Sequence, residues 1–421
     1  MKKDIVYKIL ICMIGIFLWV LLTCPRIDIE SVSIWQSCED DPIYILSAVA
    51  QPKLKWNIVE YIVLNVLDGS VGIIFDCCIY GQKHENAYRT MAHIKQKYTV
   101  DKRNVRMFAT QYYCSCEDIS FKPLNIVLVE RHEICTPSEQ MKTVIYPEIK
   151  ANSTAICTKV AFNYLNPIHL IEWFEYQKLM GVETVLIMLQ TLNSDAYAVF
   201  KHYEMEGIVQ LLSFPDVLPG CIDRGFEKNR WHMFQSVHDE QLAVFTCEQL
   251  LQGFAFVAVI DFDEYIIHDK FLTYSEFLKS ELLPSHPDAA GFVLNVSFFL
   301  TDWGISGTGN MLTTKYIRRT NPRYERYKNI YLPKRTKTVD THTIHPKKGY
   351  KRIVLTSHSV VLHHYRKCPS SPQWKFCLRY TKTLDFKMFK IMPVLYYHVD
   401  LVMKEIGIIN HTDNIFRKTR I

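Results

Sequence analysis

This chain is short of glycine and proline, which make up 15 and 17 of its 421 residues. That composition excludes a collagen-like protein, and the sequence has neither an internal repeat nor a low-complexity stretch. It also lacks long apolar runs apart from one near the N-terminus, which excludes a membrane protein with several spans. Hydrophobic residues make up 48% and charged residues 22% of the chain, values that exclude intrinsic disorder. The length therefore indicates a globular protein of about two to three domains.

Acidic side chains are nearly missing from one segment. Residues 311–390 contain 20 lysines and arginines but only Glu325, Asp340 and Asp385, which gives a net charge of +17. The other 341 residues contain 29 basic and 40 acidic side chains, or −11, so the overall value of +6 hides this division. We expect an anionic partner to bind near the basic segment.

The single apolar run covers Ile9–Cys24 and follows Lys2, Lys3 and Lys8. A helix of its 16 residues would be about 24 Å long, which suits a thin early-secretory membrane. A cleaved signal peptide is the alternative, but no small-x-small cleavage pattern follows the run. The basic flank predicts residues 1–8 as a cytosolic tail, residues 9–24 as a transmembrane signal-anchor, and the remaining chain in the lumen. This is the topology of a single-pass type II membrane protein.

Cysteine usage agrees with a lumenal location. None of the 13 cysteines has the CxxC spacing of a zinc site, and 11 lie beyond the apolar run. Four of these stand in two close pairs and are expected to form disulfides in an oxidising compartment: Cys77, Cys78, Cys114 and Cys116. Because the number beyond the run is odd, at least one cysteine stays free or pairs between chains. Glycosylation sequons at Asn152 and Asn410 also favour the secretory route.

Two regions follow the predicted anchor. Residues 25–150 contain short apolar runs rich in valine and isoleucine, which predict a stem and a small β-rich domain. From 151 to 405, strands and helices alternate with short connections, which predicts an α/β domain with parallel strands; residues 406–421 are a C-terminal tail. The expected elements are strand 155–162, helix 166–180, strand 185–189, helix 193–206, strand 208–213, helix 234–251 and strand 254–260.

The last of these strands ends in Asp261-Phe262-Asp263-Glu264-Tyr265. The carboxyl end of a central parallel strand is where α/β sheets bind ligands. In an extended chain Asp261 and Asp263 would project to the same side and reach one site. Two carboxylates in one crevice repel each other, and a divalent cation with oxygen ligands relieves that repulsion. Such an ion can bridge a diphosphate and neutralise a departing one.

The motif has two other possible meanings besides a metal site. An acidic cluster at a strand end can merely cap a helix or face solvent, which is the commoner meaning of Asp-x-Asp alone. A phosphatase of the haloacid-dehalogenase type also uses Asp-x-Asp, but it has threonine or valine at the position where this chain has Tyr265. The phosphatase motif also usually opens its domain, whereas three strands precede the motif in this chain. The buried strand before the motif favours the metal site.

Further motifs extend over residues from about 155 to 405. They are Glu172-Trp173-Phe174-Glu175-Tyr176, Leu179-Met180-Gly181-Val182-Glu183, Tyr203 with Gly207-Ile208-Val209, Gln241, Cys247, the Asp-x-Asp stretch, Trp303-Gly304-Ile305-Ser306-Gly307, His342, and His364-Tyr365-Arg366. In these motifs the chain resembles glycosyltransferase family 92, a family of type II membrane enzymes.

The resemblance implies a GT-A fold, which is a nucleotide-diphospho-sugar transferase-like α/β domain, here preceded by the β-rich domain and the transmembrane helix. It implies transfer of a hexose, namely galactose from UDP-galactose with inversion, onto a glycan of a glycoprotein or glycolipid in the Golgi lumen. The implied donor is a UDP-sugar, and the implied cofactor is Mn²⁺ or another divalent cation.

The resemblance also suggests a metal site of three ligands. Asp261 and Asp263 would hold the cation against the UDP diphosphate, and His364 is the candidate third ligand because GT-A enzymes often complete the site with a downstream histidine. A packed strand histidine is the alternative for His364, and the adjacent His363 leaves the assignment open.

Phosphate oxygens would be contacted by Arg366 and by a basic group of Lys334, Arg335 and Lys337. Arginine binds phosphate through two parallel N–H groups, and lysine acts as a point charge. Most of the basic segment is expected to be solvated surface, with two or three phosphate contacts at most.

An inverting transfer also needs a carboxylate that takes the proton of the acceptor hydroxyl. Asp302 is the candidate, because it follows an apolar strand at 291–300 and stands beside the loop Gly304–Gly309. Glu264 is the alternative, although it could only hydrogen-bond the metal ligands. The glycine loop could close over bound UDP.

A function of another class stays open: a catalytically inactive, lectin-like family member that binds glycans in the lumen. The intact pair of Asp261 and Asp263 favours the enzyme, since a decayed enzyme would have little reason to keep it. The basic segment would also suit nucleic acid, but a lumenal protein is not expected to meet that partner.

Overall fold

The computed structural model describes residues 43–52, 59–82, 87–99, 105, 107–138, 140–216, 235–270, 272–356, 359–368 and 377–408. The predicted cytosolic tail and signal-anchor, and most of the predicted C-terminal tail, lie outside these ranges. Of the helices within the ranges, none has the length and apolar character needed to cross a membrane.

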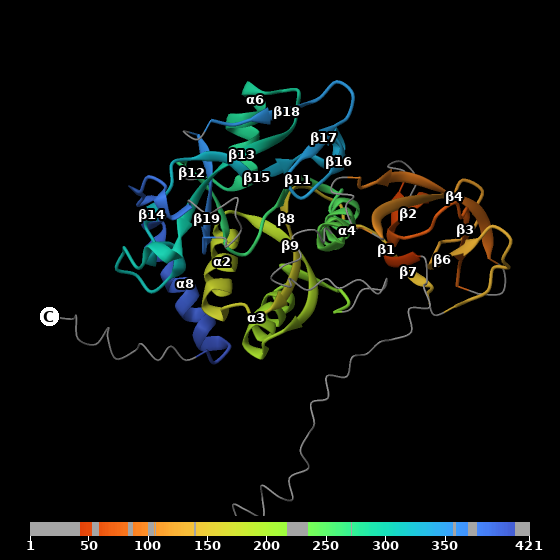
Figure 1. Cartoon of the computed structure of the whole chain (residues 1–421), viewed down its shortest axis with the longest axis horizontal. Coiled ribbons are helices and arrows are strands. Elements are labelled where there is room, and N and C mark those ends of the chain that lie inside the picture. Colours follow the sequence, from red (N-terminus) through yellow and green to blue (C-terminus); the bar gives the residue numbers. More distant parts are fainter. Residues whose placement is uncertain are drawn as a thin grey trace, which may run out of the picture. The chain divides into compact units, whose positions relative to one another are not determined.

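Strands between residues 43 and 145 form a closed barrel (Figure 1). They are hydrogen-bonded in the order β1, β2, β5, β4, β3, β6 and β7, and β7 closes the barrel by pairing in parallel with β1. Their bounds are β1 Ile43–Pro52, β2 Val59–Asp68, β3 Phe75–Tyr80, β4 Tyr88–Lys97, β5 Phe108–Ser115, β6 Asn125–Glu130 and β7 Lys142–Ile145.

Two disulfides join the strands of this barrel. Neighbouring residues of a strand point to opposite faces, so Cys77 and Cys78 of β3 find different partners. Cys77 is bonded to Cys114 of β5, and Cys78 is bonded to Cys135 beyond β6. The expectation that Cys116 forms a disulfide is wrong, because Cys116 is a free, buried cysteine.

The described residues from 150 onward build a nine-stranded sheet in the order β10, β9, β8, β11, β15, β13, β19 and β12, with β18 beside β13. Strands β8 to β11 pair in parallel, and β15 runs antiparallel to β11. The bounds are β8 Lys150–Asn163, β9 Val182–Leu192, β10 Val209–Ser213, β11 Phe254–Val259, β12 Glu264–His268, β13 Ala289–Leu300, β15 Arg323–Tyr331, β18 Lys351–Val354 and β19 Val360–Arg366. The mixed α/β fold with parallel strands predicted from the sequence is confirmed.

Short ribbons and helices complete the described structure. The ribbons pair β14 (Arg318–Arg319) with β20 (Thr383–Leu384), and β16 (Thr336–Val339) with β17 (Ile344–Pro346). The helices are α2 Pro167–Leu179, α3 Ser194–Met205, α4 Gln235–Leu250, α5 Tyr274–Phe277, α6 Leu283–Ser285, α7 Leu312–Lys315 and α8 Met392–Glu405.

Local signals determine both ends of helix α2. The side-chain oxygen of Asn166 accepts the backbone N–H groups of Ile168 and His169, and Pro167 occupies the first position, where an N–H would have no partner in the helix. After the helix, Gly181 has a φ of 74°, a conformation that glycine adopts readily.

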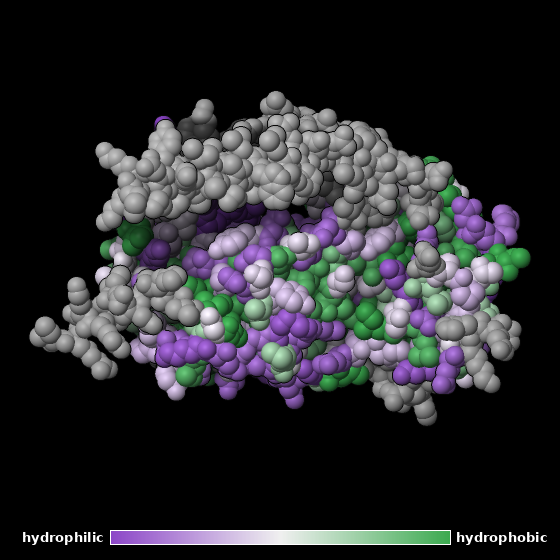
Figure 2. Space-filling model, turned by 90° about the horizontal axis from the view of Figure 1, so that it is seen from below, coloured by the Kyte–Doolittle hydropathy of each residue, from purple (hydrophilic) through white to green (hydrophobic). Residues whose placement is uncertain are grey.

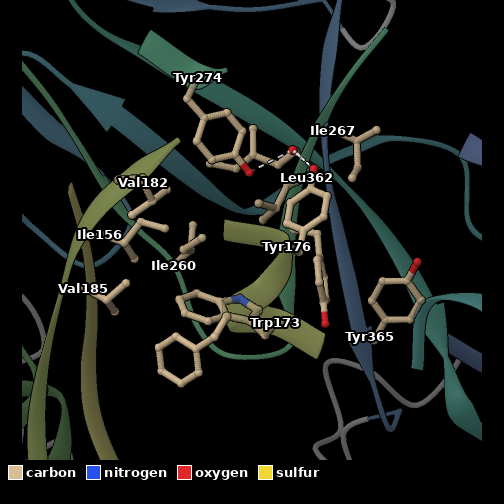
Figure 3. Packing of buried hydrophobic residues seen from close by; sticks show 14 of the residues in the cluster. Ile156, Trp173, Tyr176, Val182, Val185, Ile260, Ile267, Tyr274, Leu362 and Tyr365 are labelled. Atoms are coloured by element: carbon tan, nitrogen blue, oxygen red, sulfur yellow. Dashed lines mark hydrogen bonds between the residues drawn. The ribbon is translucent and has the colours of Figure 1, made fainter. Parts of the chain in front are cut away.

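The inner face of α2 holds the start of strand β12 in place (Figure 3). The indole N–H of Trp173 donates to the carbonyl oxygen of Glu264 at 2.9 Å. The hydroxyl groups of Tyr176 and Tyr274 both donate to the carbonyl oxygen of Ile266, at 2.6 and 3.1 Å. Because Trp173 and Tyr176 are fully or almost fully buried, each stabilises this packing by about 3 kcal/mol.

Helix α4 packs on the other face of the sheet and on the barrel. The disulfide between Cys157 of β8 and Cys247 of α4 links the helix to the sheet. On the barrel side, the hydroxyls of Ser47 and Thr246 lie 2.9 Å apart, and the Gln111 amide donates to the carbonyl oxygen of Phe245. The strands that carry the candidate site are therefore covered on both faces.

One face of the molecule shows hydrophilic and hydrophobic residues interspersed (Figure 2). Exposed large apolar side chains of the described residues include Val71, Ile134 and Ile305. Because folded chains always leave some apolar atoms at the surface, these scattered side chains need no functional explanation.

Candidate active site

The two aspartates of the Asp-x-Asp motif lie in a tight turn between β11 and β12. The N–H of Glu264 donates to the carbonyl oxygen of Asp261 at 3.1 Å, and the N–H of Asp261 donates to the Glu264 carboxylate at 2.8 Å. Between them, Phe262 packs against the rings of Trp173 and Phe200. An extended chain was expected at these residues, but the reciprocal hydrogen bonds and the partly buried Phe262 ring form a turn instead.

Asp261 is bound by two buried lysines. Its carboxylate oxygens lie 3.1 Å from the ammonium of Lys159 and 2.9 Å from that of Lys328. Only 8% and 2% of these two lysine side chains are exposed. Burial alone would raise the pKa of Asp261, but the two ammonium groups outweigh burial and lower it far below its usual range.

Lys159 reaches the site because strand β8 is irregular at that position. Its φ is 63°, a left-handed conformation that is uncommon for residues other than glycine, and the pairing of β8 with β9 shifts register between Cys157 and Val160. Such irregularities re-aim side chains near functional sites. The same ammonium forms an ion pair with Glu240 of α4.

Glu264 and His364 form the second half of the site. Glu264 is fully buried, and its two oxygens lie 3.1 Å from the Lys328 ammonium and 3.2 Å from Nδ1 of His364. Burial raises the pKa of Glu264 in spite of this lysine. On its other side, His364 places Nε2 3.3 Å from a carboxylate oxygen of Asp263. The Asp263 side chain is 41% exposed and that of His364 only 7%, so the carboxylate faces solvent and the imidazole is buried behind it.

Of the three predicted metal ligands, Asp263 and His364 lie beside each other, and Asp261 is paired with two lysines. Among the described residues, no group of three or more histidine, cysteine or acidic side chains is placed to hold a metal ion. Both oxygens of Asp261 already face ammonium groups, whereas Asp263 and Nε2 of His364 face each other. Ions of the magnesium type are commonly bound by one or two protein groups, with substrate phosphates and water completing the shell.

Arg366 and Asp302 lie at the same end of the sheet as His364. Arg366 follows His364 by two residues on β19 and is paired with Leu300, the last residue of β13. The pKa of Arg366 is lowered, because burial and the neighbouring Arg326 outweigh the opposite effect of Asp263 and the carboxylates beside it. Asp302 comes directly after β13, is exposed, and accepts the N–H of Cys368 at 2.6 Å.

The other predicted phosphate ligands lie elsewhere. Arg335 donates to the carbonyl oxygen of Ala289, the first residue of β13, whereas His364 pairs with Phe298 near its end. Since a strand rises about 3.3 Å per residue, this distance along β13 is roughly 30 Å. The structure therefore does not bring Lys334, Arg335 and Lys337 together with the acidic residues.

Lys159, Lys328 and Arg326 were missed in the sequence. A signal did exist for the two lysines, because each is a single charge within an apolar strand-like run, at 155–162 and 327–331. A buried lysine requires a carboxylate partner, so each of these runs predicts a carboxylate close to its lysine. Arg326 has no such signal, and its φ of 49° is visible only in the structure.

The sequence model of glycosyltransferase family 92 matches residues 152–395, more than half of the chain. This chain belongs to glycosyltransferase family 92. The family resemblance found in the sequence is thus confirmed, and all the residues of the acidic site fall within the matched range. Membership of family 92 supports a role in glycosyl transfer.

Two other comparisons add little to the family assignment. No curated protein matches the sequence significantly. A crystal structure of S. aureus TarS, residues 1–349, is similar at 9% identity and a TM-score of 0.26, over 58% of this chain and 65% of the TarS chain. The match thus spans less than two thirds of the length of TarS.

Proposed function

We propose that this family 92 protein is a metal-dependent hexosyltransferase of GT-A type. It transfers galactose from UDP-galactose, with inversion, onto a glycan of a glycoprotein or glycolipid. The observation that carries the proposal is the contact of the partly exposed Asp263 with the buried His364, with Arg366 two residues further along β19. A carboxylate, an imidazole and a guanidinium at one sheet edge are the groups that a cation–diphosphate ligand requires.

Asp263 and His364 would hold the cation, Mn²⁺ or another divalent ion. When bound, the ion supplies positive charge to a diphosphate leaving group. Glu264 orients His364 by lying 3.2 Å from its Nδ1, in the way that carboxylates orient metal-binding histidines. Asp261 stays paired with Lys159 and Lys328 and so keeps the turn in place, while Arg366 binds phosphate oxygens.

Asp302 is the better candidate for the base that accepts the proton of the acceptor hydroxyl. It is exposed, and one of its oxygens accepts the N–H of Cys368, which orients the carboxylate. Glu264 is fully buried, and both of its oxygens lie beside cationic or imidazole groups. A group in that position can orient its neighbours but cannot reach an acceptor sugar.

We also propose a Golgi location, with residues 9–24 as the membrane anchor of a single-pass type II protein. Four disulfides in the described part of the chain support an oxidising compartment: Cys77–Cys114, Cys78–Cys135, Cys157–Cys247 and Cys368–Cys377.

One observation favours the alternative of a lectin-like protein that binds glycans without transfer. Both oxygens of Asp261 are engaged by ammonium groups, so the motif supplies only one carboxylate to a metal. Such a protein would bind a glycan equally well with and without Mn²⁺ and would not require UDP.

Calorimetry of UDP binding to the purified lumenal part separates the two. We expect binding that needs Mn²⁺ and that Asp263→Asn or His364→Ala weakens at least tenfold, because each removes one ligand. Lys337→Met is the control, since Lys337 is exposed and far from the site, and it should bind UDP normally. Absence of UDP binding with and without Mn²⁺ would overturn the proposal. UDP-galactose turnover then tests the donor sugar, and loss of turnover with intact UDP binding in Asp302→Asn tests the base.

A further inference from the structure

Helix α7 is held by a carboxylate from a distant helix. Glu172, on the inner face of α2, is fully buried. One of its oxygens accepts the N–H of Leu312 at 2.6 Å, and the other accepts both the N–H of Thr313, at 3.0 Å, and the Thr313 hydroxyl. Leu312 and Thr313 are the first residues of α7, whose N–H groups have no partner within that helix. Glu172 therefore supplies the start of α7 with its hydrogen-bond acceptors.

The glycine loop Gly304–Gly309 is packed directly against α7. The N–H groups of Ser306 and Gly307 both donate to the carbonyl oxygen of Lys315 at 3.1 Å. A Cβ atom at Gly307 would lie 1.9 Å from the carbonyl oxygen of Thr314, so the loop backbone leaves no space against the helix. Displacement of α7 would displace Gly304–Gly309 as well.

This loop begins at the candidate active site. Asp302 lies just beyond the pairing of Leu300 with Arg366, and its carboxylate accepts the N–H of Cys368. Trp303 comes next and donates its indole N–H to the carbonyl oxygen of Leu378. The chain from Asp302 to α7 thus connects the proposed base to the residues that Glu172 binds.

Glu172 lacks a charged partner. Within the described ranges, no lysine, arginine or histidine forms an ion pair with it, and burial raises its pKa to about 7 although its three donors lower it. The groups that face it are the phenols of Tyr265 on β12 and Tyr365 on β19, whose own pKa values are raised well above their usual range, so they stay neutral. On its own helix, burial and Lys315 of α7 lower the pKa of His169 to about 4, so His169 is also neutral near pH 7.

We propose that Glu172 is a positioning residue: ionised, it holds α7 and the Gly304–Gly309 loop beside the proposed donor site, and protonated, it releases them. All three of its partners are donors, and a carboxylic acid has only one unprotonated oxygen. The Thr313 hydroxyl can turn round and accept the new proton, but one backbone N–H of α7 is then left with only the weakly accepting hydroxyl oxygen of the acid. The position of the loop beside a donor site rests on the proposed function, whereas the anchoring of α7 by Glu172 does not.

Hydrogen exchange of the 304–316 segment tests the proposal. After correction for the intrinsic rate at each pH, we expect protection of the α7 amides to fall roughly tenfold between pH 8 and pH 6, with a midpoint near 7. Glu172→Gln should show the weaker protection at every pH and no step, since the amide does not titrate. Glu175→Gln is the matched control, because Glu175 is also buried on α2 but accepts from Tyr203 and Lys178 instead. It should keep the step.

Thr313→Ala provides a second variant in case Glu172→Gln does not fold. It removes a donor that favours the ionised carboxyl, so the midpoint should move above that of the wild type. No step in the wild type, a step retained in Glu172→Gln, a step lost in Glu175→Gln or an unchanged midpoint in Thr313→Ala would each overturn the inference. A protein that shows the step but binds no UDP would contradict only the proposed function, and the reverse result would contradict only this inference.

Discussion

Replacing Lys328 by methionine removes the buried ammonium that joins the two halves of the site. Lys328 lies 2.9 Å from Asp261 and 3.1 Å from Glu264, and only 2% of its side chain is exposed. Methionine is flexible and of similar length, so it should fill the space without a large cavity. The principal effect is therefore the loss of one positive charge between two carboxylates.

The expected cost is about 3 kcal/mol of unfolding free energy at pH 7.5, the lower end of the range for breaking a buried ion pair. The lower end applies because Asp261 keeps its pair with Lys159, so Glu264 is the group left without a cation. The pKa of Glu264 is already raised by burial and should rise further in the variant. A carboxyl whose pKa is raised by folding binds more protons in the folded state, so the stability that it contributes at low pH is lost as pH rises. The deficit of the variant should thus shrink as pH falls.

Urea denaturation followed by tryptophan fluorescence between pH 5 and 8 measures this deficit. Lys337→Met is the control: Lys337 is exposed, and its replacement should change the unfolding free energy by at most about 0.5 kcal/mol. The reasoning is refuted if the two variants lose the same amount, or if the loss in Lys328→Met does not change with pH.

Three further predictions concern stability. Trp173→Phe removes the indole N–H that donates to Glu264 and should cost about 2 kcal/mol in urea denaturation; wild-type stability would contradict the packing of α2 on β12. Replacing both Cys157 and Cys247 by serine opens the disulfide between β8 and α4 and should cost about 4 kcal/mol, whereas an unchanged midpoint after reduction would argue against the bond. Burial lowers the pKa of His363 to about 3, so the wild type should lose about 3 kcal/mol on going from pH 6.5 to 4 through this group, because the unfolded state binds the proton. His363→Phe should lack that part of the acid loss, and identical pH profiles would count against it.

Elements of the α/β half could be predicted closely because their signals are local. Asn166, Pro167 and Gly181 act on backbone groups within a few residues, and the observed helix α2 begins and ends where they stand. The alternation of apolar strands and helices likewise indicated parallel pairing, and the family motifs lie in the same segments. The position of Asp261 and Asp263 after a buried strand could be predicted for the same reason, since it depends only on where β11 ends.

The partners of these carboxylates depend on the pairing of strands that are distant in the sequence. Lys328 is 67 residues from Asp261, and it meets that carboxylate because β15 lies antiparallel to β11. The same strand direction carries Arg335 to the opposite end of β13, away from the acidic site. Residue types and spacing do not reveal strand order or register. The sequence by itself therefore determined the family, the α/β pattern and the place of the acidic motif after a buried strand, and only the tertiary structure decided that lysines neutralise Asp261 and that Asp263 faces His364.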